Sequence, residues 1–165
     1  MNPTDQPVFN HTRIRYAKGY VELGLFRDAL QELESIDGPD ATSDESIAVW
    51  IDVLVGLEKW GDLESVCSSL TERQPEEPRW WLFWAHAQKM RGHLQEARNI
   101  GLRAIRFHPS NPAIRHDLAR TCCLLGDLPS ACRYVGDAIE LDPSFRKKAI
   151  QDPDLEAMRG SGLIM

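Results

Sequence analysis

Residues 92–109, GHLQEARNIGLRAIRFHP, and residues 126–143, GDLPSACRYVGDAIELDP, follow one pattern at a distance of 34 positions. Each stretch begins with glycine, ends with proline and carries alanine at the same two places, which are Ala97 and Ala104 in the first stretch and Ala131 and Ala138 in the second. Pro75 precedes Pro109 by the same interval that separates Pro109 from Pro143. An internal period of this length is typical of solenoids built from stacked helix pairs. The sequence therefore predicts an all-α repeat protein.

The turns inside the repeats are predicted from glycine. Four glycines are followed two residues later by leucine or phenylalanine, namely Gly24, Gly61, Gly92 and Gly126. Relative to the interval from Gly92 to Gly126, the first interval is too long and the second is too short by the same amount. We interpret these unequal spacings as an extra loop turn at residues 37–46 and a shortened helix before Pro75. Helix starts are indicated by Asn111 before Pro112, by Asp62 and Asp127 after their glycines, and by a possible Thr42–Glu45 capping box.

With these turns aligned, the chain resembles the tetratricopeptide repeat over roughly residues 10–145. The positions eleven residues before the glycines hold Arg13, Trp50, Trp81 and Arg115, and the small or β-branched packing positions after them hold Ala29, Val66, Ala97 and Ala131. The resemblance implies a right-handed α-α superhelix of four helix-turn-helix repeats, at about residues 10–43, 44–77, 78–111 and 112–145. Residues 1–9 are expected to form a flexible N-terminal segment, and residues 146–165 a capping helix and tail.

The composition limits the ligand classes and the location that we expect. A net charge of −6 and an isoelectric point near 5.4 argue against nucleic acid as the main ligand, since phosphate binding needs a basic surface. No apolar run of 18 residues is present, and the first residues have neither the basic nor the apolar region of a signal peptide. We therefore expect a cytoplasmic protein that binds neither nucleic acid nor membrane.

Motifs for catalysis and for metal binding are missing from the sequence. It has no nucleophile elbow, no phosphate-binding glycine loop and no His-Glu-x-x-His, which predicts a non-enzymatic protein without a cofactor. Its four cysteines form no Cys-x-x-Cys pair, so no metal site is predicted. Cys67 and Cys132 are expected to pack as small hydrophobic residues, which leaves Cys123 as the candidate for an exposed thiol. An adventitious metal site at His86, His116 and Cys123 is a weaker alternative.

The resemblance also implies a concave groove lined by the first helix of each pair. Carried over from the turn glycines, the groove residues are His11, Ile14, Lys18, Ile51, Val55, Arg79, Leu82, His86, Lys89, His116 and Arg120. Four of them are cations in a chain of net charge −6, which favours an acidic segment or a C-terminal carboxylate as ligand. The apolar members would contact an anchor side chain. The alternative is that these cations form only the polar side of amphipathic helices.

The function predicted from these features is a protein-protein interaction module, an adaptor or scaffold that binds a protein or peptide of acidic character. The alternatives are a chaperone of a secretion system and a regulatory subunit of an enzyme complex. A monomer or weak homodimer is expected, since the apolar tail Gly162–Met165 could dock on another copy. Trp60 and Trp80 fall outside the packing pattern, and either could be an exposed anchor or cover a seam between repeats.

Overall fold

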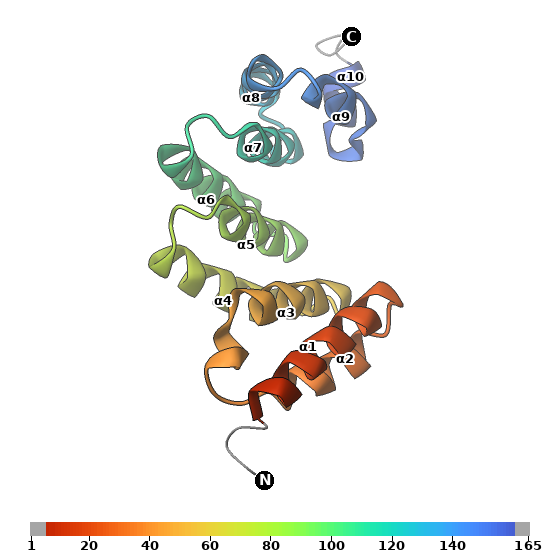
Figure 1. The fold of residues 1–165 in the computed structure, drawn as a ribbon. Helices are drawn as coiled ribbons and strands as arrows, with labels where there is room; N and C mark the ends of the chain where they lie inside the picture. Colours follow the sequence, from red (N-terminus) through yellow and green to blue (C-terminus); the bar gives the residue numbers. More distant parts are fainter. Residues whose placement is uncertain (1–5, 161–165) are drawn as a thin grey trace. The chain divides into compact units, whose positions relative to one another are not determined.

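The computed structural model describes the backbone of residues 6–160 and the side chains of residues 9–158, and all regular elements of the described part are helices (Figure 1). The tail Gly162–Met165 lies outside the described residues. Four helix pairs follow one another along the chain: α1 Gln6–Glu22 with α2 Phe26–Glu34, α3 Asp44–Gly56 with α4 Trp60–Arg73, α5 Pro78–Met90 with α6 Leu94–Phe107, and α7 Pro112–Leu124 with α8 Leu128–Leu141. The predicted all-α solenoid of helix pairs is thus confirmed.

Shorter helices precede the second pair and follow the fourth. The short 3-10 helix η1, Gly38–Thr42, lies in the stretch where an extra turn was predicted, and it joins α2 to α3. After α8 come α9 Phe145–Gln151, the 3-10 helix η2 Pro153–Leu155, and α10 Glu156–Gly160. The expected capping helix is therefore broken near Asp152 and Pro153, because proline cannot donate a backbone hydrogen bond to the preceding turn.

The helix starts repeat at the same interval as the prolines. Helices α2, α4, α6 and α8 begin at equal intervals along the chain, and so do α3, α5 and α7. Helix α4 has 14 residues, as α6 and α8 do, so the prediction of a shortened helix before Pro75 was wrong.

The glycine spacing is unequal because Gly61 is not the turn residue of the second helix pair. Gly24, Gly92 and Gly126 have φ between 72° and 79°, and the matching residue of the second pair is Glu58, with φ 54°. At Glu58 the backbone makes the same two hydrogen bonds as at the glycines, from Glu58 N to Val55 O (3.0 Å) and from Lys59 N to Leu54 O (2.9 Å). This is the Schellman ending of a helix, in which a left-handed residue closes the last turn. Gly61 instead lies within the first turn of α4.

The corrected register changes the packing positions of the second pair. Leu63, which is completely buried, and not Val66, takes the place of Ala29, Ala97 and Ala131. Trp60 is the first residue of α4 and corresponds to Phe26, Leu94 and Leu128. The N-caps follow the same correction: Asp62 lies inside α4, whereas Asp127 Oδ1 accepts from Ser130 N (3.2 Å) and Asn111 Oδ1 accepts from Ala113 N (2.9 Å), as predicted. The cap of α3 is Ser43 in place of Thr42.

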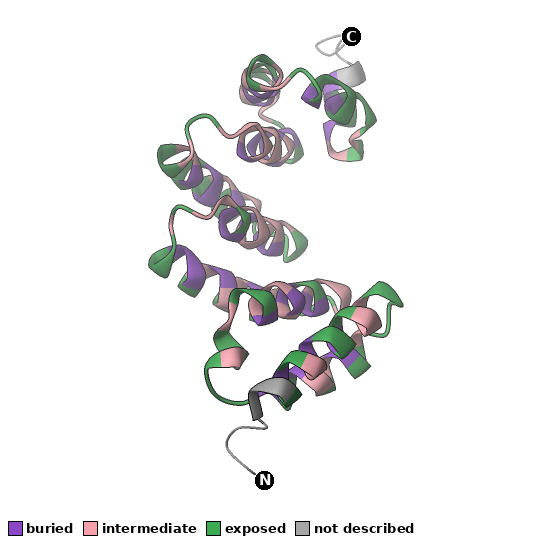
Figure 2. Ribbon diagram, viewed as in Figure 1, coloured by how far each residue is buried: buried purple, intermediate pink, exposed green. Residues whose placement is uncertain are grey.

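The described chain divides into two compact units, unit 1 (Met1–Leu63) and unit 2 (Glu64–Met165), with the boundary inside α4. Each helix buries one side against its neighbours and exposes the other (Figure 2). The core of unit 1 is formed by Ile14, Ala17, Ala29, Leu33, Ile36, Val49 and Val53. Asn10 fixes the start of α1 to the η1 region, since its Nδ2 donates to Asp37 O and Asp40 Oδ2, both at 3.0 Å. The predicted extra turn is thus held by a buried amide.

In unit 2 the core runs from α5 to α10. One cluster contains Trp81, Ala85, Ile100, Ala104 and Ile114, and another contains Leu118, Ala119, Cys122, Cys123, Ala131, Tyr134, Val135, Ala149, Leu155 and Met158. Helices α6 and α7 approach closely at Gly101, where a Cβ atom would meet Leu118 Cδ1 at 3.0 Å. At this place a glycine therefore allows the close approach of the two helices.

Trp80 and three of the four cysteines are buried. Trp80 is buried, and its Nε1 donates to Gln74 Oε1 (3.1 Å), so it covers a seam and is not an exposed anchor. Cys123 is buried as well, so its prediction as an exposed thiol was wrong. The reason is that the backbone of Ala157 and Met158 lies against its sulfur. Cys67 is buried as expected, and Cys132 is only partly buried.

We predict that Glu58→Gly and Gly61→Ala both stabilise the protein. In Glu58→Gly, a glycine adopts the positive φ of this position without the steric cost of a side chain. The free energy of unfolding should therefore rise by about 1 kcal/mol. Gly61→Ala replaces a helical glycine with open space around it and should add about 0.5–1 kcal/mol. Urea denaturation of each variant measures the change. The reverse control, Gly92→Glu, should lose about 1 kcal/mol. If Gly61→Ala instead destabilises the protein, the assignment of Glu58, and not Gly61, as the turn residue of the second pair is contradicted.

Candidate functional site

The predicted groove residues lie on α1 and α3 of unit 1 and on α5 and α7 of unit 2, and they differ in accessibility. His11, Lys18 and Arg79 are exposed, and six others are partly buried, namely Val55, Leu82, His86, Lys89, His116 and Arg120. Ile14 and Ile51 are only 1% exposed, so they contribute to the core and line no surface. In the corrected register Ile51 matches the buried Ala17, Ala85 and Ala119. Asp52, which is exposed, takes the place that Lys18, His86 and Arg120 occupy in the other inner helices.

In unit 1, two of the predicted residues line an open hollow of about 590 Å³ between α1 and α3. Its lining residues are His11, Thr12, Arg15, Lys18 and Glu45. Lys18 forms an ion pair with Glu45, and this hydrogen-bonded partner lowers the pKa of the Glu45 carboxyl. Arg15 also lines the hollow but was not predicted, because it lies one position outside the register used for the groove. The hollow thus presents two side-chain cations and one carboxylate.

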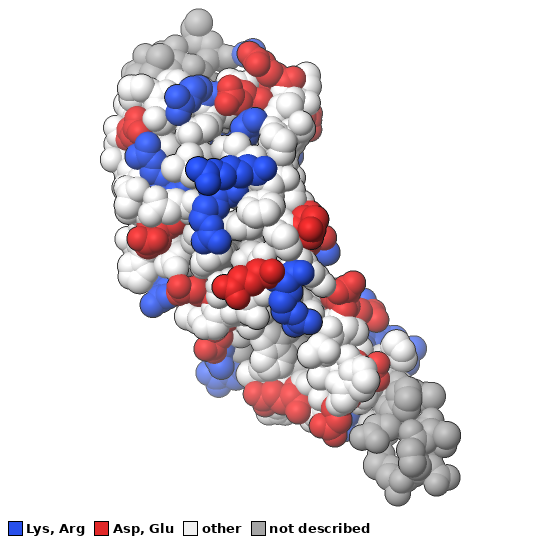
Figure 3. Space-filling model, turned by 90° about the vertical axis from the view of Figure 1, so that its left-hand side faces the viewer, with Lys and Arg blue, Asp and Glu red and all other residues white. Residues whose placement is uncertain are grey.

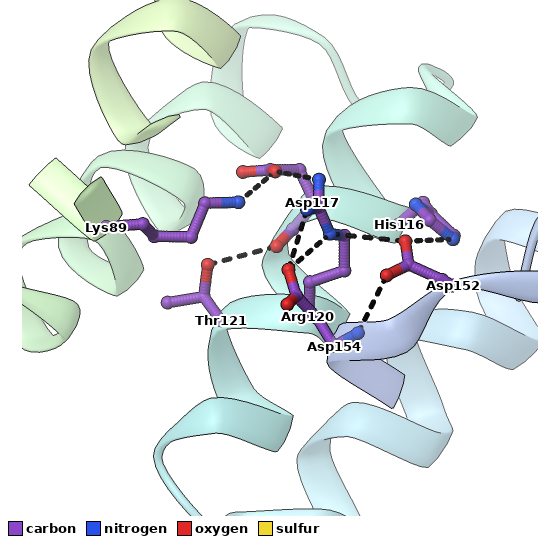
Figure 4. Close-up of polar contacts among 7 residues, drawn as sticks. All are labelled: Lys89, His116, Asp117, Arg120, Thr121, Asp152 and Asp154. Carbon is purple, nitrogen blue, oxygen red and sulfur yellow. Dashed lines mark hydrogen bonds and ion pairs between the residues drawn. The ribbon is translucent and has the colours of Figure 1, made fainter. Parts of the chain in front are cut away.

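In unit 2, the predicted cations Lys89 and Arg120 belong to a network of charged residues on α5, α7 and the segment 152–154 (Figure 4). Lys89 Nζ pairs with Asp117 Oδ1, and the Lys89 side chain is only 5% exposed. Arg120 lies between three carboxylates, at 3.5 Å from Asp117 Oδ1, 3.2 Å from Asp152 Oδ2 and 2.6 Å from Asp154 Oδ2. Burial opposes the charged form of Arg120, but the three carboxylates outweigh it and raise the pKa of the guanidinium. Arg120 is therefore fully occupied by its own chain.

The C-terminal segment covers the inner side of α7. Arg120 Nε and Nη2 both donate to Asp154 Oδ2, at 2.9 and 2.6 Å, and Asp152 Oδ1 accepts from Asp154 N (3.0 Å). Leu155 and Met158 of the same segment are completely buried. The acidic sequence Asp152-Pro153-Asp154 thus occupies the place on α7 where an external acidic ligand was predicted to bind.

The histidines of unit 2 lie beside this network. Burial lowers the pKa of His86, with Lys89 acting in the same direction. Burial likewise lowers the pKa of His116, although Asp152 opposes this, with 3.7 Å between His116 Nε2 and Asp152 Oδ2. His116 Nε2 makes no hydrogen bond within the described part of the chain. Both imidazoles are therefore neutral at pH 7.

All four predicted cations have a carboxylate neighbour, since Arg79 Nε also pairs with Glu77 Oε1 at 3.0 Å. The carboxylates around Arg120 could not be predicted from the repeat, because Asp117, Asp152 and Asp154 follow no repeat pattern. Within residues 9–158, no group of three histidine, cysteine or acidic side chains is placed to hold a metal ion. No helix of the described residues is both long and apolar enough to cross a membrane.

We predict that Arg120 holds the C-terminal segment in place. Arg120→Met leaves Asp152 and Asp154 without their cation, whereas Asp117 keeps Lys89, and should lower the free energy of unfolding by about 2 kcal/mol. The matched control, Lys18→Met, breaks an exposed pair and should cost less than about 1 kcal/mol. Hydrogen exchange read by mass spectrometry should show faster exchange of α9 in Arg120→Met. Unchanged exchange there would contradict the assigned role.

We also predict that stability falls on mild acidification. Because the pKa values of His86 and His116 are lowered in the folded state, the unfolded chain binds more protons below its own histidine pKa of about 6.5. The free energy of unfolding should therefore decrease between pH 7.5 and pH 5.5. The double variant His86→Gln/His116→Gln should lose part of this decrease, measured by urea denaturation at both pH values. A variant with the full decrease would rule out the two histidines as its source.

Comparison with known proteins supports the fold of the chain. No family model and no curated protein matches the chain. Among solved structures, the MamA RS-1 ArsTM double mutant superimposes with a TM-score of 0.70 at 13% identity, over 82% of this chain and 76% of that one. TTC0263, a thermophilic TPR protein of Thermus thermophilus, gives 0.65 at 16% identity, over 94% and 100%. The chain therefore has the fold of a tetratricopeptide-repeat solenoid.

Proposed function

We propose that this chain is a non-enzymatic adaptor or scaffold that binds a protein or peptide through the inner helices of its repeats. Solenoids of this kind present extended surfaces built from equivalent positions of successive repeats. The described residues offer such positions on α1, α3 and α5, whereas on α7 the chain's own C-terminal segment covers them.

The observation that carries this proposal is the hollow between α1 and α3. It is open to solvent, and it contains His11 and Lys18, two residues that the repeat register had selected. Its further cation, Arg15, is exposed and has no ion pair with a carboxylate of the described residues. A partner carboxylate at Arg15 would gain a charge-assisted hydrogen bond without displacing an internal one.

The partner favoured by this hollow is a segment of acidic character. Lys18 is already shared with Glu45, so the excess positive charge comes from Arg15. On unit 2, Arg79 is exposed and Leu82 and His86 are partly exposed on α5, where they offer polar and apolar groups of their own. Electrostatic complementarity of this kind adds selectivity and association rate more than affinity.

The proposal is tested with fluorescein-labelled peptides of equal length that share their apolar residues and differ only in being acidic, neutral or basic. The acidic peptides should bind more tightly than the basic ones in fluorescence anisotropy. Arg15→Glu should weaken acidic binding about tenfold, which is about 1.4 kcal/mol. The matched control is Arg27→Glu, an equal charge change at an exposed residue of α2, and it should change affinity less than about twofold. Equal effects of the two variants, or equal binding of acidic and basic peptides, would contradict the proposal.

A further inference from the structure

The arginines near the end of α6 and the start of α7 differ from the cations of the predicted groove. Arg103, Arg106 and Arg115 form no ion pair with any carboxylate of the described residues. All three belong to unit 2, and Arg103 and Arg106 are exposed.

These arginines lie around an aromatic surface. The Arg103 guanidinium lies over the rings of Trp81 and Trp84, at 5.3 Å from each centroid. Phe107 stacks on Trp81 with a centroid distance of 5.3 Å and is nevertheless 53% exposed. Arg106 and Phe107 follow Arg103 by three and four positions on α6, so both side chains lie on the same side of the helix as Arg103. We call Arg103, Arg106, Phe107 and Arg115 the α6 patch.

Arg115 of α7 contacts the loop that connects α6 to α7. Its guanidinium donates to the carbonyl of Pro109, two residues after the end of α6. The loop itself is fixed, since Trp81 Nε1 donates to Pro75 O and a ring nitrogen of His108 approaches the same carbonyl, both at 2.9 Å. Figure 3 looks onto the side that carries this loop and shows blue side chains gathered near its middle, with few red ones among them.

The α6 patch presents the exposed guanidinium groups of Arg103 and Arg106 as hydrogen-bond donors. Two buried donors, Trp84 Nε1 and the Nε of the Arg115 guanidinium, have no acceptor in the described structure. Arginine binds a carboxylate with two parallel hydrogen bonds, and an exposed ring beside it favours an aromatic or aliphatic contact. The chemistry that complements this surface is therefore a carboxylate-rich segment with one large apolar side chain.

We propose that the α6 patch is a second docking surface, which binds an acidic segment of a partner protein that carries an aromatic residue among its carboxylates. This proposal rests on the proposed function of the chain as an interaction module, but the residues of the α6 patch are not those of the hollow of unit 1. Nucleic acid fits less well, because three arginines on a chain of net charge −6 neutralise few phosphates.

The test uses a fluorescein-labelled peptide of Asp and Glu with one central Trp, and a second peptide with Gly in place of Trp. Fluorescence anisotropy should show binding of the first peptide, weaker binding of the second, and a loss of affinity with rising salt. Arg103→Gln/Arg106→Gln should weaken binding at least about tenfold. Arg27→Gln/Arg133→Gln, which removes two charges from exposed positions elsewhere, should change it less than about twofold.

Two further variants keep the result interpretable. Arg106→Glu alone changes an exposed side chain and leaves Arg103 over its tryptophans, so it should weaken binding with the thermal midpoint unchanged. Arg15→Glu, in the hollow of unit 1, should leave binding of the Trp peptide unchanged. If Arg15→Glu abolishes binding while the α6 variants do not, the α6 patch is refuted and the proposed function stands.

Three other results would also overturn the α6 patch. The first is no binding of the Trp peptide to the unaltered chain. The second is displacement of the peptide by a single-stranded DNA of equal length at equal concentration, which would point to a general anion site. The third is self-association in sedimentation velocity that Arg106→Glu removes, which would make a second copy of the chain the occupant.

Discussion

The left-handed residue that ends each inner helix is the constraint on which the rest of this structure depends. At Gly24, Glu58, Gly92 and Gly126 the backbone closes the helix with the same pair of hydrogen bonds, and the next helix begins two residues later. This fixes the direction in which the second helix leaves, and hence which of its residues meet the first. The completely buried Leu63 can replace alanine in the second pair because the turn, and not the side-chain volume, sets the register.

Most of the fold could be predicted, because the prolines and small residues that recur at a fixed interval reflect backbone geometry. The prediction failed in the second pair, where glycine is absent from the turn and present nearby inside α4. Glycine is preferred at positive φ but not required there, so Gly61 was a misleading marker. Pro75 carried the missing information, since it follows Glu58 by the same interval that separates Gly92 from Pro109. The positions of the prolines, which interrupt helices, thus predicted the repeat spacing better than the positions of the glycines.

The candidate site was less predictable, because it depends on contacts between residues far apart in the sequence. Lys18, Lys89 and Arg120 lie on the first helices of their pairs, but the repeat pattern holds no information on their partners. Asp154 lies far beyond Arg120 in the sequence and reaches it only because the chain turns back at η2. Whether a cation is available to a ligand depends on such partners, and the count of charges on a helix does not reveal them. We therefore propose the unmatched arginines, and not Arg120, as the residues that contact an acidic ligand.

The distribution of ion pairs separates two uses of arginine in this chain. Arg120 is enclosed by carboxylates and stabilises the end of the solenoid, where the last repeat would otherwise expose its apolar side. Arg103 and Arg106 are on the surface of an internal repeat, so the end of the solenoid does not depend on their charge. A cation that stabilises no carboxylate and lies beside an exposed ring still repels other cations and costs the ordering of its side chain. Binding to a carboxylate-bearing partner would offset both costs, which is why we propose the unmatched arginines, and not the paired ones, as the place where a partner docks.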